Sequence, residues 1–204
     1  WQRFDAPGVN QFNPLIAPFQ NFTTVTGSSA TTTLADTYNI DIQHGFRFWS
    51  INRLTYGINY RHNTLSSNLV TQDSHENRLG FFLQDDVKLA ESLSLVAGIR
   101  YDMDTFINPT YSPRAALIYS PSQEHTFRLS ASVAYRPPTL FEKNANILVT
   151  TNPPLPPFQS RITGAPSISP EEIISYEAEY QGWYLQHRLR ARGAVFFNHI
   201  SDLI

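Results

Sequence analysis

The 204-residue chain contains no cysteine, few charged residues and no long hydrophobic run. The lack of cysteine excludes a disulfide framework and thiolate metal sites. Charged residues make up 16% of the chain, whereas a typical soluble domain has about 25%. No apolar run approaches the roughly 18 residues that a transmembrane helix needs. If the chain spans a membrane, it therefore does so with strands.

The chain is close to neutral, with a net charge of -2. This charge provides no basic field for a phosphate backbone, so nucleic acid is not an expected partner. The first residues, WQRFDAPGVN, lack an initiator methionine and the pattern of a signal peptide. We therefore expect the chain to be a piece of a longer protein.

The stretch LSLVAGIRYD, residues 93–102, alternates apolar and polar side chains. Successive side chains of a strand point to opposite faces. One face would carry Leu93, Leu95, Ala97, Ile99 and Tyr101, and the other Ser94, Gly98, Arg100 and Asp102. Such a strand belongs either to a half-buried soluble sheet or to the wall of a water-filled membrane barrel.

The same alternation recurs along the chain and predicts about eight strands. They cover residues 36–44, 53–62, 76–88, 93–103, 111–120, 125–136, 171–184 and 187–198. Several match the roughly 9 to 11 residues of a tilted strand that crosses a bilayer. Short turns, such as PSQE at 121–124, alternate with longer connections, as in outer-membrane barrels. The prediction is an all-β fold, an antiparallel transmembrane β-barrel segment.

Charged and polar side chains recur on one face of these strands. An Arg or Lys that faced lipid at mid-depth would cost about 2 to 4 kcal/mol, so this face is predicted to line the lumen or contact a plug. The predicted lumenal residues are Arg61, Arg78, Gln84, Asp86, Arg100, Asp102, Arg114, Arg128, Arg136, Glu177, Glu179, Arg188, Arg190 and Arg192. Charge pairing between neighbouring strands is the favoured role, and guidance of an anionic solute is the alternative.

Tyrosines lie near the ends of the predicted strands. Tyr60, Tyr101, Tyr111, Tyr119, Tyr135, Tyr176 and Tyr184 are predicted to form lipid-facing aromatic girdles at the two rims. The alternative is that tyrosine is simply a good strand residue.

Four segments are predicted as loops: 1–30, 63–75, 104–110 and 137–168. Residues 1–30 and 137–168 lack sustained alternation, and the second contains TNPPLPPF, whose prolines cannot donate to a strand ladder. Loops longer than about 15 residues are usually functional or disordered. We expect 1–30, 63–75 and 137–168 to be extracellular and to contact a ligand.

A set of short strings appears in an order that is typical of one family. They are Gln84-Asp85-Asp86, Gly98-Ile99-Arg100-Tyr101-Asp102, Ser112-Pro113-Arg114, Tyr135-Arg136-Pro137-Pro138-Thr139-Leu140, Ser169-Pro170-Glu171, Tyr176-Glu177-Ala178-Glu179-Tyr180 and the stretch FFNHISDLI. The ordered set, over residues 53–204, resembles the TonB-dependent outer-membrane receptors, which import siderophores, haem, cobalamin and other scarce solutes.

The resemblance implies a barrel of about 22 strands, an N-terminal plug domain and a TonB box. It implies an outer-membrane location in a Gram-negative bacterium. The implied partners are the TonB energy-coupling protein, outer-membrane lipid and a small-molecule or metal-chelate ligand, with no cofactor. Residues 1–204 would then be an internal to C-terminal part of one barrel domain, without its plug.

A passive porin-like channel or an adhesin-type barrel is the alternative function. An outer-membrane hydrolase would need a catalytic constellation at the rim, and an enzyme is not predicted. Asp85 and Asp86 are adjacent on a strand, so they face opposite sides and cannot flank one bond. Glu177 and Glu179 share a face, but arginines on the same face match them.

The six histidines are scattered along the chain, without cysteine beside them, so no metal site is predicted. They are His44, His62, His75, His125, His187 and His199. His62 and His75 bracket one predicted loop and could meet there. The stretch NILVTTNPPLPP holds no histidine, which disfavours haem capture by that loop.

Overall fold

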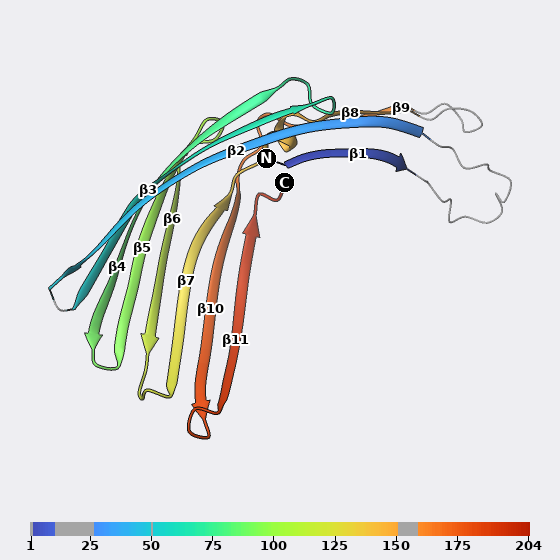
Figure 1. The fold of residues 1–204 in the computed structure, drawn as a ribbon. Coiled ribbons are helices and arrows are strands. Elements are labelled where there is room, and N and C mark those ends of the chain that lie inside the picture. The colour runs from blue at the N-terminus through green and yellow to red at the C-terminus, as the bar shows by residue number, and fades with distance from the viewer. Residues whose placement is uncertain (1, 11–26, 50, 151–158) are drawn as a thin grey trace, which may run out of the picture. The chain divides into compact units, whose positions relative to one another are not determined.

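The fold is known from a computed structural model of the chain, which describes residues 2–10, 27–49, 51–150 and 159–204 (Figure 1). Nine strands form one sheet in the order β1-β2-β3-β4-β5-β6-β7-β10-β11. They are β1 (Gln2–Asn10), β2 (Gly27–Phe48), β3 (Asn52–Ser67), β4 (Ser74–Ala90), β5 (Leu93–Asp104), β6 (Thr110–Tyr119), β7 (His125–Arg136), β10 (Glu171–Tyr184) and β11 (Leu189–Ser201). Within the described ranges, no helix is long and apolar enough to cross a bilayer.

The prediction of an all-β antiparallel fold is confirmed. The eight predicted strands correspond to β2–β7, β10 and β11, which follow one another in the sheet in chain order. The register is continuous where β5 pairs with β6, from Leu93↔Tyr119 to Asp102↔Thr110. Sequential antiparallel strands of this kind are the architecture that alternating apolar and polar residues predict.

The connections alternate in length less strictly than predicted. Residues 91–92 and 185–188 are tight turns. Leu185, Gln186 and His187 all have positive φ, at 53°, 55° and 65°, which is uncommon for residues other than glycine. The connection at 105–109 is no longer than the one at 120–124, because β5 and β6 extend to Asp104 and Thr110.

The prediction that residues 1–30 are a loop is wrong for Gln2–Asn10 and for residues 27–30. β1 pairs with β2 from Gln2↔Ala35 to Asn10↔Gly27, and residues 11–26 lie outside the described part of the chain. The predicted loop 63–75 shrinks to 68–73, since β3 ends at Ser67 and β4 begins at Ser74. These extensions lack a sustained alternation of apolar and polar residues, so hydrophobic periodicity could not detect them.

Two compact units divide the chain. The first comprises Trp1–Tyr38, His62–Glu76 and Thr139–Ile168, and it corrects the prediction that 137–168 is only a loop. The helix α1 (Leu140–Asn144) and the hairpin of β8 (Asn146–Thr150) with β9 (Gln159–Thr163) form there. A capping box starts α1: Thr139 Oγ1 accepts from the Glu142 amide at 3.2 Å, and Glu142 Oε2 accepts from the Thr139 amide at 2.7 Å.

Backbone hydrogen bonds join this helix and hairpin to residues 69–71. The amide of Thr71 donates to Asn144 O at 2.8 Å, and the amide of Asn146 donates to Leu69 O at 2.7 Å. Leu65, Val70 and Leu140 form a small buried apolar cluster beneath these bonds. The segments 62–76 and 139–168 are therefore held as one folded body.

The second unit comprises Asn39–Arg61, Asn77–Pro138 and Ser169–Ile204. In Figure 1 its strands β5, β6, β7, β10 and β11 run side by side. Many large apolar side chains of these strands are exposed, among them Leu129 at 59% and Val195 at 71%. An exposed apolar surface of this extent indicates a membrane or protein partner for that face.

Glycine is required at Gly57 because side chain and backbone approach it closely. A Cβ at this position would lie 2.5 Å from Ile42 O and 2.6 Å from the Phe82 ring. At Gly193, in contrast, no atom lies within 4 Å of where a Cβ would be. The Phe82 ring therefore packs across β3 at a place where only glycine leaves room for it.

We expect Gly57→Val to destabilise the folded protein by about 1 to 3 kcal/mol, because the added methyl groups overpack the contact with Phe82 and Ile42. The measurement is the fraction of folded, heat-modifiable barrel that the full-length protein retains over a denaturant series. Gly193→Val is the matched control, and we expect it to be neutral. Equal losses for both variants would contradict this account of Gly57.

Candidate functional site

The register sorts the predicted site residues onto two opposite faces of the second unit. On one face lie Arg78, Gln84, Asp86, Arg100, Asp102, Arg114, Arg128, Arg136, Glu177, Glu179, Arg190 and Arg192, which we call the charged face. The opposite face, the aromatic face, carries Tyr101, Tyr111, Tyr119, Tyr135, Tyr176 and Tyr184. Alternation along each strand and direct pairing between strands produce this separation.

Arg100 and Asp102 form an ion pair on the charged face that three hydrogen bonds hold together. The guanidinium donates from Nε at 2.7 Å and 2.9 Å and from Nη2 at 2.6 Å to the carboxylate. The two residues are two positions apart on β5, so they share a face. A Cβ at Gly80 on β4 would collide with this guanidinium, so the glycine allows Arg100 to lie across the neighbouring strand.

Arg114 repeats the arrangement one strand further along. Its guanidinium donates to Gln84 Oε1, and Gln84 Nε2 donates to Asp86 Oδ1 at 2.7 Å. Arg114 is directly opposite Gly98 in the register, so the long side chain passes over a residue without one. Arg100 thus finds its partner on its own strand, whereas Arg114 on β6 extends across β5 to Gln84 on β4.

Ion pairs between neighbouring strands extend the charged face. Arg78 Nε lies 2.8 Å from Asp104 Oδ2, and the Asp104 side chain is only 5% exposed. Arg136 binds Glu171 through two bonds, at 2.7 Å and 3.1 Å. Arg192 Nε lies 2.6 Å from Glu179 Oε1, with the Arg192 side chain 60% exposed. The pairs differ in burial, so they contribute unequally to stability.

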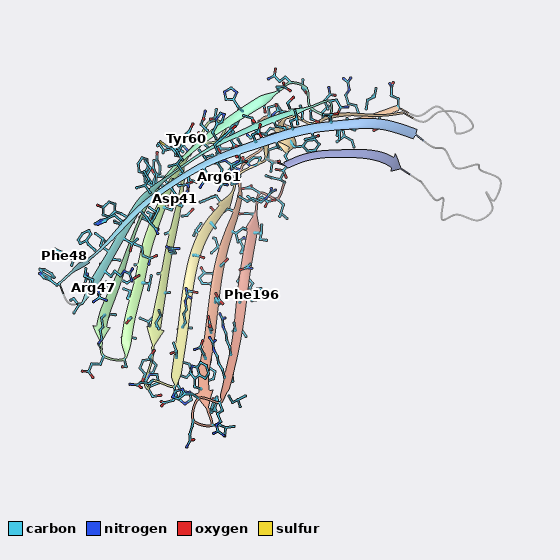
Figure 2. The ribbon with its side chains drawn as sticks, viewed as in Figure 1. Asp41, Arg47, Phe48, Tyr60, Arg61 and Phe196 are labelled. Carbon is cyan, nitrogen blue, oxygen red and sulfur yellow. The ribbon has the colours of Figure 1, made fainter. Side chains whose placement is uncertain are left out.

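A polar group on β2 and β3 adds Asn39 and Asp41, which the sequence did not predict, to the predicted Arg61. Asn59 Nδ2 donates to Asn39 Oδ1 and to Asp41 Oδ2, both at 3.1 Å, and Arg61 Nε donates to Asn39 Oδ1 at 3.4 Å. Figure 2 labels Asp41 and Arg61 on these two strands. Asn39 and Asp41 occupy alternate, odd-numbered positions of β2. This polar alternation in the sequence could have identified both residues.

A polar cavity of about 200 Å³ lies among these side chains. Its charged lining residues are Arg61, Arg78, Arg100, Asp102 and Asp104, with Asn59, Tyr135 and others beside them. Three guanidinium groups face two carboxylates, so the cavity has an excess of positive charge. Such a lining favours an anionic group, either of a small molecule or of another protein segment.

One predicted residue lies elsewhere. Arg188 belongs to the turn at 185–188, because β11 begins at Leu189 and not at residue 187 as predicted. The Arg188 amide donates to Leu185 O at 3.2 Å within that turn. Arg190, two residues later, donates to Gln181 Oε1 at 2.5 Å and lies 5.5 Å from the centre of the Trp183 ring.

The aromatic face carries ring clusters at the strand ends. Tyr101 and Tyr111 are paired in the register, with ring centroids 4.9 Å apart, and Tyr119 lies 6.3 Å from Phe127. A second cluster was not predicted: Tyr180 OH lies 2.9 Å from His125 Nδ1 and also bonds the Tyr184 hydroxyl. Tyr60 donates to Asn77 Oδ1 at 2.8 Å.

The separation of the two faces is not complete. Asp85 shares the aromatic face with Leu83 and Leu79, and it accepts a hydrogen bond from Asn52 Nδ2 at 2.9 Å. Phe196 lies on the charged face opposite Glu177 and is 74% exposed (Figure 2). Asp85 is therefore a carboxylate on the aromatic face, and its Oδ2 has a polar partner in Asn52.

The described part of the chain contains no group of three or more histidine, cysteine or acidic residues that could hold a metal ion. The arrangement instead offers a wall of charged side chains, several of them ion-paired, at fixed positions. Its chemistry is that of binding and orientation: forked guanidinium donors and carboxylate acceptors are held at defined positions along neighbouring strands.

We expect Arg78→Ala to lower the free energy of unfolding by about 1 to 3 kcal/mol, because it leaves the buried Asp104 carboxylate without its guanidinium. Arg192→Ala is the matched control, since its exposed pair with Glu179 should contribute less than about 1 kcal/mol. Denaturant midpoints of the full-length variants measure both values. A larger loss of unfolding free energy in Arg192→Ala than in Arg78→Ala would show that burial does not determine how much each ion pair stabilises the protein.

Comparison with known proteins places this geometry in context. The family model described as "TonB dependent receptor-like, beta-barrel" matches residues 2–204. No curated protein sequence matches the chain.

Several solved structures share the fold. The siderophore receptor PirA from Acinetobacter baumannii matches with a TM-score of 0.69 at 15% identity, over 89% of this chain and 29% of that chain. PirA from Pseudomonas aeruginosa gives 0.73 at 15%, over 85% and 34%. The FrpB iron transporter from Neisseria meningitidis gives 0.65 at 16%, over 88% and 30%. The chain thus spans about a third or less of each of these proteins.

Proposed function

The chain belongs to the family of TonB-dependent receptor β-barrels, and we propose that it forms part of an outer-membrane receptor that imports a scarce solute with energy from the TonB system. The family consists of transport receptors rather than enzymes, and the sheet is a segment of a transmembrane β-barrel. The match over residues 2–204 is the observation that carries the proposal. The proposed location is the outer membrane of a Gram-negative bacterium.

The two faces of the second unit receive opposite roles in this proposal. The charged face would line the lumen, together with Arg61, and the aromatic face, together with Tyr60, would contact lipid. The cost of burying arginine in hydrocarbon supports this orientation. The tyrosine rings would lie at the membrane interfaces, where an apolar ring and a polar hydroxyl are both accommodated.

The proposed ligand is an iron chelate or a similar scarce solute such as cobalamin. Structures with the same fold are described as siderophore receptors and as an iron transporter, which supports the iron chelate. The proposed partners are the TonB protein, reached through a plug domain of the full-length protein, and outer-membrane lipid. The cavity lined by Arg61, Arg78 and Arg100 could hold an anionic group of the ligand or of the plug.

The orientation of the faces can be tested with two neighbouring residues of β7. Leu129→Arg would bring a guanidinium into hydrocarbon, and we expect it to cost about 2 to 4 kcal/mol of folding free energy. Ser130→Arg lies opposite Glu177 on the charged face, and we expect a change within about 1 kcal/mol. The readout is the fraction of full-length protein that inserts into vesicles as folded barrel. A larger loss for Ser130→Arg than for Leu129→Arg would mean that the charged face, and not the aromatic face, contacts lipid.

The proposed transport can be tested in a host that lacks its own receptors and expresses the full-length protein. We expect uptake of labelled ferric siderophores or cobalamin that stops when the proton-motive force is dissipated. Deletion of the region that precedes Trp1 should abolish the same uptake, because energy coupling would pass through it. Uptake or conductance that does not depend on the proton gradient would mean a passive pore, as in the alternative porin-like hypothesis.

A further inference from the structure

Two histidines that are 13 positions apart in the sequence come together in the first unit. The ring centroids of His62 on β3 and His75 on β4 are 6.1 Å apart, and their planes are inclined by 38°. Tyr38 on β2 extends the row, with its ring 6.3 Å from that of His62. His75 and Tyr38 are exposed, and His62 is half-buried. The pair therefore lies at a surface that solvent can reach.

The residues around the pair show that it lies in water rather than in hydrocarbon. Along β3 the face that carries Leu54, Tyr56, Ile58 and Tyr60 continues as His62, Thr64 and Ser66. Along β4 the face of Leu79, Phe81 and Leu83 begins with His75 and Asn77. On this face, β3 is apolar up to Tyr60 and polar from His62 onward, and β4 is polar up to Asn77 and apolar from Leu79 onward. Both histidines lie in the polar part, where a dissolved ion can reach them.

We infer that His62 and His75 form a two-histidine site for a divalent transition-metal ion of tetragonal geometry, Cu²⁺ above all. With metal–nitrogen bonds of about 2.0 to 2.1 Å, two imidazoles on one ion have centroids about 5 Å apart at the tetrahedral angle of Zn²⁺, and about 6.4 Å apart when the two nitrogens lie trans. The observed 6.1 Å is close to the trans value, which fits a tetragonal Cu²⁺ site better than a tetrahedral Zn²⁺ site. Imidazole nitrogen suits Zn²⁺ and Cu²⁺, and Cu²⁺ is the tightest binder of the first-row series.

Among the described residues, no further histidine, cysteine or acidic side chain completes a group of three with this pair, so water would supply the other ligands. The site is independent of the proposed transport, since neither histidine lies in the lumenal wall of the second unit. A bound ion would join β3 to β4 beside the connection at 68–73 and stabilise that end of the hairpin.

The test uses the full-length protein in detergent, titrated with Cu²⁺ and followed by electron paramagnetic resonance and by thermal unfolding. We expect the wild type to bind one more equivalent of Cu²⁺ than His75→Ala, with nitrogen splitting from two imidazoles. In His75→Ala the affinity of this site should fall by about tenfold or more, because one imidazole alone then holds the ion. His62→Ala should give the same loss, and Cu²⁺ should raise the melting temperature of the wild type only.

His199→Ala is the matched control. His199 is exposed and lies on a strand of the second unit, β11, so its removal should leave the extra equivalent in place. Heat-modifiable migration without metal establishes that each variant is folded. Equal Cu²⁺ binding by the wild type, His75→Ala and His62→Ala would overturn the inference, and so would an equal loss in His199→Ala.

Discussion

Backbone hydrogen bonding between antiparallel strands is the constraint on which the rest of this structure depends. An N–H or C=O group without a partner in hydrocarbon costs several kcal/mol, so strands that cross a bilayer must be paired along their whole length. The register from β4 through β7 to β10 and β11 provides that pairing. Because the side-chain period is two, the same register also fixes which residues share a face. The separation of charged from aromatic side chains is a consequence of pairing.

The second consequence concerns how long side chains fit on the charged face. Arg100 lies over Gly80, Arg114 is opposite Gly98, and the Phe82 ring covers Gly57. Glycine normally weakens a strand, yet here it leaves the space that a neighbouring side chain occupies. The ion pairs that result contribute little free energy where they are exposed. Their main effect is geometric, because each guanidinium is held in one direction.

How far the sequence predicts this structure depends on the environment of each strand. β5, β7 and β10 were predicted almost to the residue, since one apolar face gives them a clear alternation. β1 was missed because Pro7 and Gly8 interrupt it. The first half of β2 was missed because its run of Ser and Thr produces no alternation. α1 and the β8–β9 hairpin were missed since they depend on hydrogen bonds to residues 69–71, which are distant in sequence. Asp85 and Asp86 do face opposite sides, as predicted, but the hydrogen bond from Asn52 to Asp85 joins two strands and could not be predicted.

The folded first unit has a consequence for ligand capture by the receptor that we propose. A flexible loop loses conformational entropy when a ligand orders it, and this loss weakens binding. Here Thr71, Asn144 and Asn146 already tie the described residues 139–150 to the segment 62–76 through backbone hydrogen bonds. The capping box at Thr139 and the cluster of Leu65, Val70 and Leu140 support the same arrangement. Much of the entropy is therefore lost during folding, so these segments can meet a ligand in an ordered state.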